Sequence, residues 1–135
     1  MKNFHASTQN VTERPSSLAN ILHLFCLLLP HHLHPMKQTN EYIDLIKAHS
    51  EELRTQFGVR QLRLFGSVSR GEQHEGSDVD VCVDMAPRIY LVSRLQRYLE
   101  QLLGCNVDVI RKHKHMNPYL LQNIENDGIC VFGEA

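Results

Sequence analysis

The sequence has no surplus of either charge and no apolar run long enough to cross a membrane. Its 14 Lys and Arg residues against 15 Asp and Glu residues give a net charge of −1. Stable, general binding to nucleic acid normally requires a basic surplus, so we expect none here. The apolar stretch at residues 18–29 is shorter than the roughly 20 residues that span a bilayer. No small-residue cleavage site of a signal peptide comes after it, and we expect no membrane association.

Paired-cysteine motifs are also absent. The four cysteines, Cys26, Cys82, Cys105 and Cys130, have no CxxC spacing. Three of them lie in apolar runs, which favours buried, reduced thiols. Reduced thiols are typical of a reducing compartment, so we expect a cytoplasmic protein.

The chain divides at Met36 into an extension and one domain. A chain of 135 residues is long enough for a single hydrophobic core. Residues 1–35 lack the helix and strand pattern of residues 36–135, so we expect a poorly ordered extension, which translation from an upstream start codon would explain. Four histidines near the end of this extension have no accompanying ligands and indicate a compositional bias, not a metal site: His23, His31, His32 and His34. Residues 36–135 form the predicted domain.

Helical and strand patterns alternate along this domain. Apolar residues at helical spacing predict helices, and apolar residues at every second position predict strands. The expected order is a helix at 40–57, a strand at 59–65, a short helix at 67–70, a polar loop at 71–76, a strand at 78–83, a helix from 87 to 103, a strand at 105–110, a helix at 118–127 and a strand at 129–132. This order predicts an α+β fold in which helices cover a small sheet.

Acidic residues interrupt two of the predicted strands. Asp78 and Asp80 alternate with valines, and residues i and i+2 of a strand point to the same face, roughly 6.5–7 Å apart. Asp108 repeats the pattern in the next strand. If the two strands are neighbours, the three carboxylates converge. Because like charges repel, such a group favours a divalent cation over solvated carboxylates.

A glycine–serine pair stands where the preceding strand ends. Gly66 allows close approach of the backbone, and Ser67 begins a predicted helix whose free N–H groups can bind phosphate. Carboxylates that bind Mg²⁺ beside a phosphate cradle indicate phosphoryl or nucleotidyl transfer, in which two Mg²⁺ ions hold the attacking and leaving oxygens. We assign Asp78 and Asp80 to both ions. We assign Asp108 to the ion that activates the acceptor hydroxyl, whose proton it can also take.

Gly66-Ser67, ten intervening residues and then Asp78-x-Asp80 resemble the signature of the DNA polymerase beta-type nucleotidyltransferase superfamily. The longer string from Leu64 to Asp80 resembles its minimal nucleotidyltransferase (MNT) branch. This resemblance covers about residues 36–132 and implies a mixed sheet with flanking helices, dependence on Mg²⁺ and ATP as donor. It also implies nucleotide-binding roles for four residues: Gly66, Ser67, Arg70 and Ser77.

The resemblance further implies a partner. Members of the MNT branch act as antitoxins that transfer AMP from ATP to a hydroxyl, here expected to be a tyrosine, of a HEPN-domain toxin. Two alternatives stay open at this point. One is an antitoxin that binds its partner by contact without catalysis. The other is a transferase for small molecules such as aminoglycosides, although this chain has no additional helical domain for such a substrate.

Three further features have ordinary structural explanations. Arg70 either assists phosphate binding or is an ion-pair partner near the acidic residues, and the sequence favours neither. The basic run at residues 111–115 is typical of a solvated loop, with contact to the acceptor as the less favoured interpretation. Cys82 shares a strand face with Asp80 but lies further along the strand, so we expect it to pack and not to bind metal.

Overall fold

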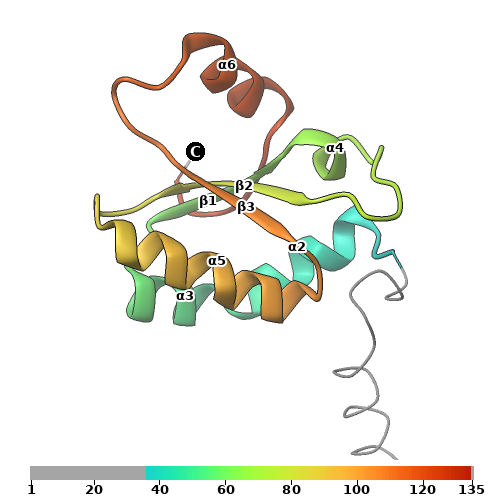
Figure 1. Ribbon diagram of the computed structural model, residues 1–135, viewed down its shortest axis with the longest axis horizontal. Coiled ribbons are helices and arrows are strands. Elements are labelled where there is room, and N and C mark those ends of the chain that lie inside the picture. The colour runs from blue at the N-terminus through green and yellow to red at the C-terminus, as the bar shows by residue number, and fades with distance from the viewer. Residues whose placement is uncertain (1–35, 135) are drawn as a thin grey trace, which may run out of the picture.

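The computed structural model describes residues 36–134 (Figure 1). The predictions made for residues 1–35 fall outside the described residues. None of the helices in the described part is long and apolar enough to cross a membrane. The elements are α2 (Thr39–Ala48), α3 (Ser50–Phe57), β1 (Gln61–Phe65), α4 (Gly66–Ser69), β2 (Val79–Asp84), α5 (Ile89–Leu103), β3 (Val107–Arg111), α6 (Pro118–Asp127) and β4 (Ile129–Phe132).

The four strands form one mixed sheet in the order β3-β2-β1-β4. β1 is antiparallel to both β2 and β4, whereas β2 and β3 are parallel. Parallel neighbours need a crossover connection, and α5 supplies it. The predicted α+β class with a mixed sheet is confirmed.

Helices cover the two faces of the sheet unequally. α2, α3 and α5 lie against one face, and α6 lies over the other (Figure 1). The valines of β2 point to the three-helix side, where Val79, Val81 and Val83 are each 0 % exposed. Burial of these side chains is what holds β2 in register, since a shift by one residue would expose them. The alternate residues of β2 therefore point to the α6 side.

A smaller apolar cluster lies on the α6 side. It is made by Phe65, Cys82, Met116 and Ile124. Cys82 is 4 % exposed, and burial raises the pKa of its thiol. The prediction that Cys82 packs in the core is confirmed. No disulfide joins the cysteines of the described region, Cys82, Cys105 and Cys130.

The prediction of one continuous helix at 40–57 is wrong, because His49 separates α2 from α3. His49 has φ −106° and ψ 12°, outside the helical region, and its N–H bonds to the Ile46 carbonyl at 3.2 Å. Ile46 and Leu53, on either side of the break, are both 0 % exposed. The apolar spacing therefore continues through the break, which is why the sequence pattern conceals it.

Strand β1 begins two residues later than predicted. Gly58 ends α3 in the left-handed conformation at φ 68°, and the N–H of Val59 bonds back to the Leu53 carbonyl at 3.2 Å. That N–H closes the helix end, as in a Schellman motif, and is not free to join the sheet. Pairing in the sheet starts at Gln61. β3 likewise begins at Val107, not at the predicted residue 105.

One hydrogen bond between α3 and α5 gives a testable pH dependence. The Tyr98 hydroxyl donates to Oε2 of Glu52 at 2.6 Å, and burial followed by this carboxylate raises the pKa of Tyr98 to about 12. We expect Tyr98→Phe to lower the free energy of unfolding by about 1.5–3 kcal/mol at pH 8, the usual contribution of a hydrogen bond to a charged group. Urea unfolding of both proteins measures this difference.

The sign of the pH dependence comes from the raised pKa. The folded protein holds the Tyr98 proton more tightly than the unfolded chain, whose pKa is near 10.0, so the stabilisation is complete below that value. It is lost as the pH rises towards about 12. The difference between wild type and Tyr98→Phe should therefore shrink over this range. Tyr119→Phe serves as the control, because Tyr119 is 79 % exposed. A difference that is constant with pH would contradict the assignment.

Candidate functional site

Two of the predicted acidic residues face each other across neighbouring strands. Asp80 of β2 and Asp108 of β3 are partners in the parallel register. Adjacent strands lie about 4.8 Å apart, and both residues point to the α6 side because their valine neighbours are buried on the other. Asp80 is partly buried and Asp108 is exposed. The sequence left open whether these two strands are neighbours, and the sheet shows that they are.

Asp78 lies immediately before β2 and is exposed. Its charge acts on Asp80: the pKa of the Asp80 carboxyl is raised by burial first, then by the charge of Asp108 and then by that of Asp78, and Arg70 opposes these effects. The three carboxylates thus lie close enough to repel one another. No ion pair within residues 36–134 neutralises any of them.

This acidic group is not arranged as a finished metal site. Among the described residues, no three His, Cys, Asp or Glu side chains lie in positions that could hold an ion as they stand. Sheet register brings Asp80 and Asp108 together, whereas Asp78 precedes the strand. Ligation of one ion by all three carboxylates would therefore require rotation of their side chains. Their role as metal ligands stays a prediction.

The Gly66-Ser67 turn lies directly against Asp80. Phe65, the last residue of β1, is paired with Asp80, and the chain then enters α4 at Gly66 with φ +72°. A Cβ atom at Gly66 would overlap Oδ2 of Asp80. Only glycine meets both the conformation and the close approach. The fold therefore places the predicted phosphate cradle next to the central carboxylate.

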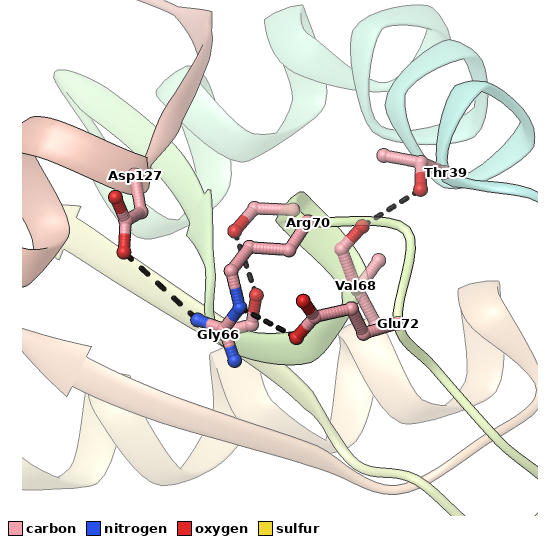
Figure 2. Close-up of polar contacts among 7 residues, drawn as sticks. Thr39, Gly66, Val68, Arg70, Glu72 and Asp127 are labelled. Atoms are coloured by element: carbon pink, nitrogen blue, oxygen red, sulfur yellow. Dashed lines mark hydrogen bonds and ion pairs between the residues drawn. The ribbon is translucent and has the colours of Figure 1, made fainter.

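Arg70 does not pair with the three aspartates. Its Nε donates to Glu72 at 2.8 Å, and its Nη1 lies 4.0 Å from Asp127 at the end of α6 (Figure 2). The pKa of Arg70 is raised chiefly by Glu72, and Asp80 contributes least. Both partners are exposed, so each pair adds little stability. Arg70 is thus an ion-pair partner, but of Glu72 and Asp127 and not of the three aspartates that the sequence suggested, while a role in phosphate binding stays a prediction.

Asp127 is the residue at this site that the sequence pattern misses. It lies 57 positions after Arg70 and comes to it only because α6 packs beside α4. No local signal marks it.

Ser77 belongs to a turn of its own. Its hydroxyl accepts a hydrogen bond from the backbone N–H of His74 at 2.9 Å and also contacts Nδ1 of the same histidine. The turn ends one residue before Asp78. Ser77 therefore acts on the loop leading into β2, and its role in nucleotide binding stays a prediction.

The basic run divides between a strand and a turn. Arg111 is the last residue of β3, and Lys112 pairs with Glu125 of α6 at 3.3 Å. Three residues of the following turn are exposed: His113, Lys114 and His115. This arrangement agrees with the solvated loop that the sequence favoured.

A four-stranded mixed sheet with acidic residues on two neighbouring parallel strands, β2 and β3, and a Gly-Ser turn beside them defines the nucleotidyltransferase class. The family model for the nucleotidyltransferase domain matches residues 46–131 of this chain. That range covers more than half of the chain and contains both the turn and all three aspartates. The chain belongs to this family and is a nucleotidyltransferase.

One curated relative and two solved structures show which members of the family this chain is similar to. Protein adenylyltransferase MntA of Thermococcus cleftensis is 44% identical over 79 residues, which make up 57% of this chain and 80% of that protein. A solved structure described as a minimal nucleotidyltransferase is 28% identical with a TM-score of 0.59, over 71% of this chain and 98% of that one. A toxin–antitoxin crystal structure with AMP-PNP is 25% identical with a TM-score of 0.53, over 73% and 75% of the two chains. The chain is thus similar to minimal members of the family.

Proposed function

We propose that this chain is an antitoxin that transfers AMP from ATP to a tyrosine hydroxyl of a HEPN-domain toxin. The observation that carries the proposal is the contact between the Gly66 turn and Asp80, beside Asp108 in the next strand. That contact joins a phosphate-binding element to an acidic centre. The similarity to a protein adenylyltransferase and to a toxin–antitoxin complex with an ATP analogue supports the protein acceptor and the nucleotide.

The donor set fits Mg²⁺. The three carboxylates offer hard oxygen ligands, and none of them forms an ion pair within the described residues. We assign two ions to Asp78 and Asp80, with Asp108 holding the one on the acceptor side. Bound there, Mg²⁺ supplies electrostatic stabilisation of the charge that develops on the transferred phosphate.

The residues of the chain have separate roles in this reaction. Gly66 and Ser67 bind the triphosphate through backbone N–H groups, and Arg70 assists them. The acceptor oxygen attacks the α-phosphorus of ATP, the bond to the bridging oxygen breaks, and pyrophosphate leaves. Asp108, which is exposed beside Asp80, accepts the hydroxyl proton.

Two roles lie outside the bond-making step. Ser77 fixes the loop that leads into Asp78 and so orients the acidic pair. The product carries AMP on the toxin, where added negative charge and bulk should oppose binding of RNA phosphates. The modification itself would then silence the toxin.

Transfer of label from ATP tests the function. The purified chain is incubated with ATP labelled on the α-phosphate, Mg²⁺ and a candidate HEPN protein, and we expect label on that protein. Asp78→Asn should abolish both labelling and protection of cells from the toxin. The control is Asp44→Asn, an exposed carboxylate of α2 on the opposite side of the sheet, which should leave both intact.

Each rival gives a different result. If Asp78→Asn still protects cells, the antitoxin acts by contact and the catalytic proposal is wrong. If label appears on an aminoglycoside or another small molecule and never on protein, the acceptor class is wrong.

A further inference from the structure

The helix that carries the predicted phosphate cradle cannot hold itself in place. α4 has only four residues, Gly66–Ser69. Nucleating a helix fixes several backbone dihedrals for a single hydrogen bond, so an isolated turn of this length is unstable. Its position must therefore come from contacts with other parts of the fold.

One such contact comes from the start of α2. The Thr39 hydroxyl donates a hydrogen bond to the Val68 carbonyl at 2.7 Å, across 29 positions of sequence (Figure 2). The Val68 side chain is 1 % exposed in the main core. Val68 is thus held in two ways. Its side chain packs in the core, and its carbonyl accepts a hydrogen bond from Thr39 of α2.

A second contact from this segment holds the loop after α4. Gln73 donates from Nε2 to the Lys37 carbonyl at 3.1 Å, and the Lys37 ammonium donates to the Leu103 carbonyl at the end of α5, at 2.9 Å. Residues 37–39 therefore connect to the chain on both sides of Arg70. These three residues form a brace between the cradle loop and the three-helix layer.

The short helix α4 is contacted at both ends. Asp80 lies against its first residue, and the brace is bonded near its last. At Gly66, the first residue of α4, the backbone lies so near Asp80 that an added Cβ atom would overlap Oδ2 of that residue. Val68, near its other end, is tied to Thr39. Without that bond, a displacement of the turn away from the acidic group is opposed by core packing of Val68 and by the bond from Gln73 to Lys37 beyond the helix.

We propose that Thr39 is a positioning residue for nucleotide transfer, which sets the distance between the Gly66-Ser67 turn and Asp80 through the Val68 carbonyl. This inference rests on the proposed function. Thr39 touches neither the aspartates nor the turn's N–H groups, so its effect on nucleotide is indirect. It is not needed to cap α2, because Gln38 occupies the N-cap.

Thr39→Val tests the inference, since valine keeps the branched shape and removes only the hydroxyl. We expect about a three- to tenfold rise in KM for ATP and in the Kd for AMP-PNP, the size of one neutral hydrogen bond. Turnover at saturating ATP should change less. Thr39→Ser, which retains the hydroxyl, should restore the wild-type values. Transfer kinetics and calorimetric titration with AMP-PNP provide the two readouts.

Thr55→Val is the matched control. The Thr55 hydroxyl also donates to a backbone carbonyl, that of Glu51 at 2.9 Å, but on the exposed side of helix α3. Wild-type KM and Kd in Thr39→Val, or equal changes in Thr39→Val and Thr55→Val, would overturn the inference. A wild-type protein that transfers no AMP would count against the proposed function instead, and the AMP-PNP affinities would then decide the role of Thr39 alone.

Discussion

Replacing Asp80 with asparagine is expected to reduce AMP transfer at least about a thousandfold while leaving the protein folded. Asp80 is the carboxylate that meets every other part of the site: Asp108 is its register partner, Asp78 acts on its pKa, and Gly66 lies against its Oδ2. Asparagine keeps the shape but loses the charge that stabilises a cation and the transition state. The rate of label transfer from ATP measures the effect.

The stability of the folded protein should not fall together with its activity. Burial and like charges raise the pKa of Asp80, which means that its ionised form is disfavoured in the folded state. Removing the charge should therefore leave the free energy of unfolding at neutral pH unchanged or slightly higher. A loss of activity together with a loss of stability would indicate a structural role and contradict this interpretation.

Asp84→Asn is the control for this variant. Asp84 lies on the same face of β2 as Asp80, four residues further along, and is tied to Arg60 by an ion pair at 2.7 Å. In the sheet its register partner is Gln61, at the far end of β1 from the Gly66 turn. We expect wild-type transfer from this variant. Equal losses in the two variants would show that the face of the strand, and not the position of Asp80, is what matters.

The core of this site could be predicted because it depends on local pattern. The alternation of valine with aspartate in β2 indicates that the segment is a strand and that its acidic residues share one face. The same alternation in β3 places Asp108 on the matching face, and a parallel crossover through α5 then makes the two strands neighbours. The alternation is read from residues close in sequence, whereas the pairing of the two strands was only a condition until the sheet was known.

Other features depend on tertiary placement and left no local sign. The ion pair of Arg70 with Asp127 forms because α6 packs beside α4, and the hydrogen bond of Thr39 to Val68 forms because α2 begins beside the cradle loop. The break at His49 is hidden for a related reason, since buried residues keep helical spacing on both sides of it. Sequence periodicity reports which side chains are buried, and it does not report where one element meets another.

Gly66→Ala is expected to have the second large effect, on nucleotide binding. Alanine at φ +72° costs about 1–2 kcal/mol, because a Cβ atom in this conformation crowds the following carbonyl. At this position the Cβ would also overlap Oδ2 of Asp80, so either the turn or the carboxylate must move. A displacement of about 1 Å at a reacting group can cost a hundredfold in rate. We expect at least that loss in AMP transfer, with weaker binding of AMP-PNP.

Gly58→Ala separates the conformational cost from the contact with Asp80. Gly58 has φ +68°, nearly the same as Gly66, but a Cβ atom there would meet nothing within 4 Å. Both variants should lose a similar free energy of unfolding from the backbone, and only Gly66→Ala should lose transfer. Urea unfolding and the transfer assay on the two proteins measure these quantities side by side. Full activity in Gly66→Ala would mean that the turn does not need its close approach to Asp80, and the site proposed for the triphosphate would then be wrong.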